Sequence, residues 1–214
     1  MSDPYKATEF KDIGSLLFRS SPAARIINFI TLYRIVTFPL LLFFLLQGKI
    51  EIFKWLLLAS FFTDAIDGFL ARRYKVSSVL GAKLDSIGDD LTVLAATVGL
   101  FVTRFAFIRE QVTIFVVLFV LFLIQFGLSF YRHKKMSTFH TYLAKVAAVT
   151  TAIFLLSVFF FDRIYYGLFY AAVFLTGIGI IEEIILAVIL KEYRSNVKGL
   201  YWVLKEAGQG RDGA

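Results

Sequence analysis

Cysteine is absent from the 214-residue chain, and charged residues are scarce. Without a thiol, the protein cannot use a thiolate nucleophile, a zinc–thiolate site or a disulfide bond. Charged residues make up 18% of the sequence and hydrophobic residues 58%, whereas soluble domains average about 25% charged and roughly 45–50% apolar. No early, short apolar stretch ends in a small-residue cleavage site, so we expect no removable signal peptide. This composition disfavours a soluble domain and predicts a membrane protein.

The apolar residues are grouped into six runs separated by short polar or basic breaks. Each run has about 20 residues, the length that crosses a hydrocarbon core of roughly 30 Å. Since the lipid interior offers no water to the backbone, each run is expected to be helical. The sequence therefore predicts an all-α, polytopic membrane protein with six transmembrane helices. The predicted spans are Ile26–Gln47, Ile50–Ala71, Ala82–Thr103, Gln111–Tyr131, Thr141–Phe161 and Tyr165–Leu190.

Two flanking segments surround this six-helix domain, which we place at residues 26–191. In the N-terminal segment, residues 1–25, an apolar stripe over residues 8–20 is typical of an amphipathic helix on the membrane surface. The C-terminal segment, residues 192–214, is expected to be a cytoplasmic tail, flexible over residues 207–214. We find neither an internal repeat nor a second domain.

The distribution of basic residues predicts how the chain is oriented. Six spans place both termini on one side, and fifteen of the 23 lysines and arginines fall on that side. The other side has Lys49, Lys54, Arg104, Arg109 and Arg163. Because cytoplasmic loops carry the excess of positive charge, both termini are expected in the cytoplasm. The net charge of +7 then indicates contact with anionic membrane lipids, and no nucleic-acid-binding module is recognisable.

Four aspartates interrupt the second and third apolar runs: Asp64, Asp67, Asp85 and Asp89. Spacings of three and four residues place each pair on one helix face. At about 1.5 Å per residue, Asp64 and Asp89 lie about 12 Å below the cytoplasmic edge, and Asp67 and Asp85 about 6–8 Å below it. Four carboxylates at such depths require cations, and Mg²⁺ or Mn²⁺ suits oxygen ligands. A cation-transport site would use the same acids, and a solvated loop is a further alternative.

The complete pattern is Asp64-x-x-Asp67-Gly68-x-x-Ala71-Arg72, eight residues, then Gly81-x-x-x-Asp85-x-x-x-Asp89. It resembles the signature of the CDP-alcohol phosphatidyltransferase family, with every specified position present. The resemblance implies a membrane enzyme with a cytoplasmic active site, a CDP-linked lipid as donor and a polar alcohol as acceptor. It also implies a homodimer. Within the family, the chain is compared with members that make phosphatidylglycerophosphate.

The resemblance assigns roles to the signature residues. Two divalent ions, Mg²⁺ or Mn²⁺, would be held by Asp64, Asp67, Asp85 and Asp89. Asp89 would also be the general base for the acceptor hydroxyl. The CDP diphosphate would be bound by Asp67, Gly68, Arg72 and Gly81.

A second, weaker pattern lies in the first predicted span, Asn28-x-x-Thr31-x-x-Arg34. It is similar to a pattern near the start of family members, which makes Asn28 and Thr31 candidates for binding the CDP group. Ordinary hydrogen bonds between membrane helices are the alternative. Arg34, about 13 Å deep, requires an acidic partner or a phosphate.

Basic residues near the fourth connection and the tail are candidates for the acceptor site. We expect Lys135 and Lys145, with Arg194 as a weaker third, to contact a phosphate on the acceptor. Positive charge that merely flanks the spans is the alternative. The best functional hypothesis is phosphatidyl transfer from CDP-diacylglycerol to glycerol 3-phosphate with release of CMP. Inositol phosphate, inositol, serine, phosphatidylglycerol or a soluble CDP-alcohol donor remain alternatives, and a divalent-cation transporter is the competing class.

Overall fold

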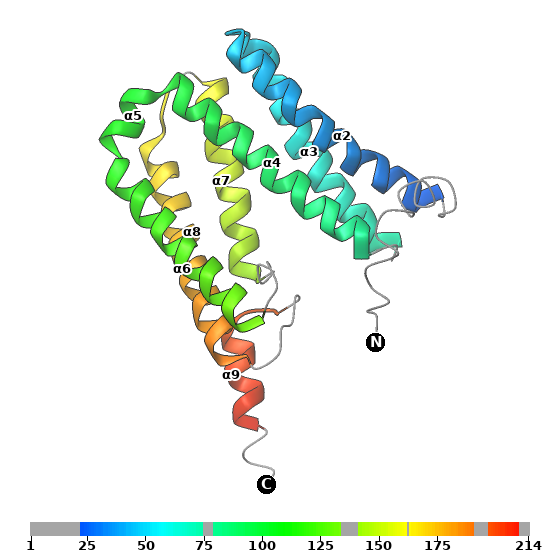
Figure 1. Cartoon of the computed structure of the whole chain (residues 1–214), viewed down its shortest axis with the longest axis vertical. Coiled ribbons are helices and arrows are strands. Elements are labelled where there is room, and N and C mark those ends of the chain that lie inside the picture. Colours follow the sequence, from blue (N-terminus) through cyan, green and yellow to red (C-terminus); the bar gives the residue numbers. More distant parts are fainter. Residues whose placement is uncertain (1–21, 75–78, 134–140, 162, 191–196, 210–214) are drawn as a thin grey trace. The chain divides into compact units, whose positions relative to one another are not determined.

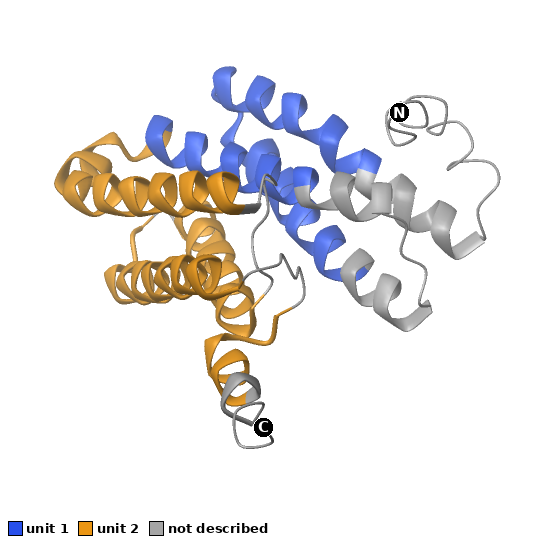
Figure 2. Cartoon of the chain, turned by 60° about the horizontal axis from the view of Figure 1, so that its bottom comes forward, with its two compact units in different colours: residues 1–102 blue, residues 103–214 orange. Residues whose placement is uncertain are grey.

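The computed structural model describes residues 22–74, 79–133, 141–161, 163–190 and 197–209. Side chains are described for a narrower set, residues 32–66, 87–132, 141–161, 163–190 and 197–205. The regular structure of this described part is helical, as predicted (Figure 1). The chain forms two compact units, residues 1–102 and 103–214 (Figure 2). The amphipathic helix predicted over residues 8–20 lies outside the described residues.

The first unit contains α2 (Pro22–Leu46), α3 (Ile50–Tyr74) and most of α4 (Val79–Thr103). Helices α2 and α3 pack side by side as a hairpin (Figure 1). Its turn is made possible by Gly48, which has φ +67°, a conformation that glycine adopts without a steric penalty. The apolar side chains of Leu41, Leu45, Phe53 and Leu57 are buried. This packing holds α2 beside α3 and so fixes the position of the charged residues that both helices contribute.

The second unit contains α5 (Phe105–Glu110), α6 (Val112–His133), α7 (Tyr142–Phe160), α8 (Tyr166–Ile189) and α9 (Leu200–Gln209). Helices α6 and α7 both pack against α8. Helix α5, which the sequence did not predict, places Phe107 in an aromatic cluster. The ring of Phe107 lies 4.9 Å from Phe169 and 6.3 Å from both Phe115 and Phe154, measured between centroids. The cluster joins α5 to the three long helices.

Three described helices are long and apolar enough to cross a membrane: Val112–Arg132, Tyr142–Phe160 and Tyr166–Ile189. The part of α2 whose side chains are described, Leu32–Leu46, is also apolar but is shorter than these three helices. Large apolar side chains such as Phe119 and Leu123 are exposed on α6, as expected for helices surrounded by lipid. Helices α3 and α4 also form where spans were predicted, but acidic and basic residues interrupt them. The structure thus supports a membrane protein, while the count of six spans stays a prediction.

Helix α9 continues to Gln209, into the C-terminal residues 207–214 for which flexibility was predicted, and that flexibility stays a prediction. Its first backbone N–H, at Leu200, donates a 2.9 Å hydrogen bond to Glu182 Oε1 of α8. Gly199, with φ +151°, precedes it. The ring of Trp202 packs against Tyr142, 5.7 Å away between centroids. Tertiary contacts therefore position this helix.

Candidate active site

The signature occupies the helices on which it was predicted. Asp64, Asp67, Gly68 and Arg72 lie in α3, and Gly81, Asp85 and Asp89 lie in α4. Side chains are described for Asp64 and Asp89. These two were expected at similar depths, about 12 Å from the cytoplasmic edge.

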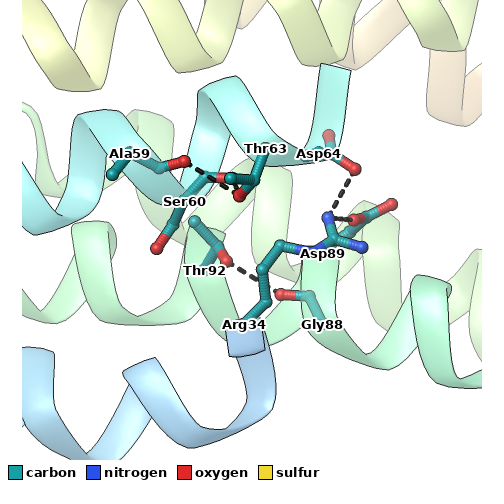
Figure 3. A network of polar contacts seen from close by, with 8 residues as sticks. All are labelled: Arg34, Ala59, Ser60, Thr63, Asp64, Gly88, Asp89 and Thr92. Carbon is teal, nitrogen blue, oxygen red and sulfur yellow. Dashed lines mark hydrogen bonds and ion pairs between the residues drawn. The ribbon is translucent and has the colours of Figure 1, made fainter. Parts of the chain in front are cut away.

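Arg34 of α2 joins Asp64 of α3 to Asp89 of α4. Its Nη1 atom donates to Oδ1 of Asp64 and to Oδ1 of Asp89 (Figure 3). The requirement that Arg34 find an acidic partner or a phosphate is therefore met by two carboxylates. The Arg34 side chain is 0% exposed, whereas those of Asp64 and Asp89 are 38% and 43% exposed. The guanidinium thus approaches from the buried side and leaves each carboxylate with an accessible side.

Gly88 provides the space that Arg34 occupies. A Cβ atom at residue 88 would lie 3.3 Å from Arg34 Nε and 3.4 Å from both Cζ and Nη2. These contacts are tight enough that the guanidinium would have to shift by a few tenths of an ångström. Thr92 Oγ1 donates a 2.9 Å hydrogen bond to the Gly88 carbonyl, within α4. A glycine directly before Asp89 therefore lets α4 approach the arginine of α2.

Several hydroxyl groups around this bridge bond to their own helices. Thr37 Oγ1 donates to the Tyr33 carbonyl at 2.8 Å, and Thr63 Oγ1 contacts the carbonyls of Ala59 and Ser60 at 2.8 and 2.9 Å. Such bonds are local and tie no helix to its neighbour. Within the part of the site that the structure describes, the interhelical polar contacts shown in Figure 3 are those of Arg34 with the two aspartates.

The two described carboxylates have the oxygen chemistry that a divalent cation prefers. Mg²⁺ and Mn²⁺ prefer oxygen ligands, and Asp64 and Asp89 bring carboxylates from two helices to one nitrogen atom. No group of three or more potential metal ligands occurs among the residues described. The side chains of Asp67 and Asp85 lie outside the described residues. The identity and number of the ions stay predictions.

The remaining predicted residues are placed to different extents. Asn28 and Thr31 lie in α2, and their side chains are not described. Lys135 and Arg194 lie outside the described residues. Lys145 is exposed in the first turns of α7, with Nζ 5.6 Å from the centroid of the Tyr142 ring. Their roles in binding the donor or the acceptor stay predictions.

Gly88 was not singled out from the sequence, although a signal was present. A glycine within a helix costs roughly 1 kcal/mol relative to alanine, so its place beside a signature aspartate suggests a packing or functional reason. The sequence alone could not name Arg34 as the neighbour it accommodates. That contact depends on how α2 and α4 are rotated.

The model of one protein family, described as CDP-alcohol phosphatidyltransferase, matches residues 25–188. This match covers most of the chain and includes the entire signature. The chain is therefore a membrane-associated transferase for substituted phosphate groups. It belongs to the CDP-alcohol phosphatidyltransferase family, whose reaction is phosphatidyl transfer from a CDP-alcohol. No solved structure matches the chain.

Membership in this family confirms the resemblance recognised from the signature. It also favours the transferase over the divalent-cation transporter. A transporter could use the same acids, but it has no need of Gly68, Ala71, Arg72 and Gly81 in register with them.

Proposed function

We propose that the protein transfers the phosphatidyl group of CDP-diacylglycerol to the hydroxyl of a polar alcohol and releases CMP. The observation that supports this most strongly is the convergence of Asp64 and Asp89, from two helices, on Arg34 in a chain of this family. Glycerol 3-phosphate is the best candidate for the acceptor. Its phosphate suits the basic residues Lys135, Lys145 and Arg194.

Asp64, Asp67, Asp85 and Asp89 would hold two divalent ions, Mg²⁺ or Mn²⁺. Bound there, the ions would neutralise negative charge that develops on the diphosphate oxygens. Arg72 would pair with the diphosphate through its planar fork of donors. Gly68 and Gly81 would allow the backbone to approach the nucleotide, and Asn28 and Thr31 would contribute hydrogen bonds from α2.

In the proposed step, Asp89 takes the proton from the acceptor hydroxyl. The hydroxyl oxygen forms a new bond to the lipid-side phosphorus. The bond between that phosphorus and the bridging oxygen breaks, and the electron pair leaves with CMP. A site at the membrane boundary suits this reaction, because the acyl chains stay in lipid while the alcohol arrives from water. We place the site and both termini in the cytoplasm, and we expect the enzyme to be a homodimer.

The experiment that tests this function incubates the purified protein with CDP-diacylglycerol, Mg²⁺ and one alcohol at a time. The alcohols are glycerol 3-phosphate, inositol phosphate, inositol, serine and phosphatidylglycerol, and the measurement is CMP release with identification of the lipid product. We expect release above the background of an Asp89→Asn control, and greatest with glycerol 3-phosphate. A soluble CDP-alcohol is tested as an alternative donor.

A binding measurement accompanies the assay. Cytidine nucleotide should raise the thermal unfolding temperature in Mn²⁺ or Mg²⁺, because a ligand that binds the folded state stabilises it. A chain that shows neither this stabilisation nor CMP release with any donor and acceptor would overturn the proposal.

A further inference from the structure

We propose that Arg34 is a positioning residue that supports Asp64 and Asp89 as cation ligands, and that Gly88 enables it to do so. The inference rests on the proposed function, because that function requires both aspartates to bind a cation. It adds a role for two residues that lie outside the assigned donor, acceptor and metal sets.

The first support is the connectivity of the bridge. One buried nitrogen atom, Arg34 Nη1, bonds to carboxylates from α3 and α4. Two carboxylates on different helices repel each other, and a guanidinium between them offsets that repulsion. A charged side chain inside a membrane helix needs such partners. Arg34 thereby fixes the position of each carboxylate relative to the other.

The second support is the side from which the arginine approaches. Its side chain is fully buried, while both aspartate side chains keep about two fifths of their surface exposed. A carboxylate has two oxygens and several lone pairs, so it can accept from Arg34 and still ligate a cation. The bridge therefore leaves the accessible side of Asp64 and Asp89 open to a cation. Hydrogen-bonded partners of this kind orient metal ligands.

The third support is the fit of Gly88 against the guanidinium. The Cβ of any other residue would lie 3.3–3.4 Å from three atoms of Arg34. Since residue 88 directly precedes Asp89, the same turn of α4 supplies both the space and one of the carboxylates. Loss of that space would move the guanidinium without changing any charge.

The test measures Mn²⁺ affinity of the full chain in lipid nanodiscs, without nucleotide, from the electron paramagnetic resonance signal of free Mn²⁺. We expect Arg34→Gln to weaken binding by about 10–100-fold, the usual effect of removing a group that orients a metal ligand. Arg34→Lys keeps the charge and should recover part of the loss. Tighter Mn²⁺ binding by Arg34→Gln would mean that the arginine competes with the cation. Either tighter binding or unchanged affinity would overturn the inference.

Gly88→Ala is the second variant. It removes no charge, so it tests the proposal even where Arg34→Gln fails to fold. It should weaken Mn²⁺ binding near the lower end of the same range, about tenfold. The matched control is Gly127→Ala in α6, where an added Cβ meets nothing within 4 Å, and its affinity should equal that of the wild type. Equal affinities for Gly88→Ala and the wild type would overturn the role of Gly88.

The two proposals fail in distinguishable ways. A wild-type protein that binds Mn²⁺ through an Arg34-dependent site but releases no CMP would overturn the proposed function alone. A wild-type protein that releases CMP, with Arg34→Gln and Gly88→Ala binding Mn²⁺ normally, would overturn this inference alone. Wild-type protein that binds no Mn²⁺ would overturn the inference directly.

Discussion

Gln125 of α6 donates a 2.9 Å hydrogen bond to Glu183 of α8, and both side chains are buried. The two helices are among those long and apolar enough to span a membrane. A buried carboxylate in such a helix is costly unless a donor reaches it. The pair therefore joins two spanning helices at a position where an unsatisfied acid would destabilise the fold.

Replacing Gln125 by Leu should lower the free energy of unfolding by about 1–3 kcal/mol, because Glu183 then loses a donor. The double variant Gln125→Leu/Glu183→Leu should lose less than the sum of the single variants. A coupling energy of about 0.6–1.7 kcal/mol is expected for a hydrogen bond between membrane helices. Reversible unfolding in detergent measures it, with Thr150→Val, whose hydroxyl bonds within α7, as the control. Additive effects would show that the contact contributes nothing to stability.

Asp89→Asn should reduce CMP release by at least about 100-fold, since an amide cannot take the proton from the acceptor and a general base contributes roughly 10²–10⁴-fold. Binding of CDP-diacylglycerol, followed as the thermal shift with metal present, should be largely retained. The control is Asp90→Asn, because Asp90 is exposed and lies outside the signature. Wild-type CMP release by Asp89→Asn would remove the assignment of the base.

Asp64→Asn and Asp67→Asn should impair metal binding itself, because each removes a charged oxygen ligand. Mn²⁺ affinity measures the effect, and a loss of tenfold or more is expected, corresponding to about 1.4 kcal/mol. In Asp64→Asn, the hydrogen bond to Arg34 is also weakened. Asp90→Asn serves again as the control, and the loss of Mn²⁺ affinity in Asp64→Asn should exceed the loss in this control. Unchanged affinity in both variants would contradict the ligand assignment.

Lys145→Ala should raise the KM for the acceptor if the acceptor is phosphorylated. A charge-assisted hydrogen bond contributes about 1.5–3 kcal/mol, which corresponds to tenfold or more in KM. The turnover number at saturating acceptor should change little. Tyr142→Leu removes the ring beside Lys145 Nζ and tests whether the ring only positions the lysine. An unchanged KM for Lys145→Ala would remove this residue from the acceptor site.

Glu182→Ala should loosen helix α9, because the Leu200 N–H loses the carboxylate that accepts its hydrogen bond. Removal of a helix-capping acceptor costs about 0.5–2 kcal/mol. Hydrogen exchange of the amides from Leu200 to Val203 should accelerate accordingly. Glu182→Gln retains an acceptor oxygen, so the same amides should exchange more slowly in this variant than in Glu182→Ala. Equal exchange in the wild type and both variants would show that the cap does not hold the helix.

The sequence predicted the six long helices because runs of apolar residues separated by polar breaks determine where such helices form. It missed α5 and α9 for different reasons. Helix α5 has six residues, too few for a periodic signal. Helix α9 has apolar residues at helical spacing, Leu200, Val203 and Leu204, but its attachment to α8 involves Glu182, eighteen residues earlier in the chain. A contact of that range has no local signature.

The candidate site was predictable to the extent that it depends on spacing along helices. The separations between the aspartates indicated two helices that present acids at matching depths, and the bridge from Asp64 to Asp89 agrees with this. The buried depth of Arg34 indicated an acidic or phosphate partner. Which acids it contacts depends on the rotation and separation of three helices, and the space at Gly88 is set by the same packing. Neither could be obtained from spacing.

The chain has two tryptophans, Trp55 in the first unit and Trp202 in the second. Because the Trp202 indole packs against Tyr142, its fluorescence should report when the end of the chain separates from the bundle. A Trp55→Phe variant would leave that indole as the sole tryptophan emitter. Undocking of the C-terminal helix could then be timed by stopped-flow spectroscopy without attaching a dye.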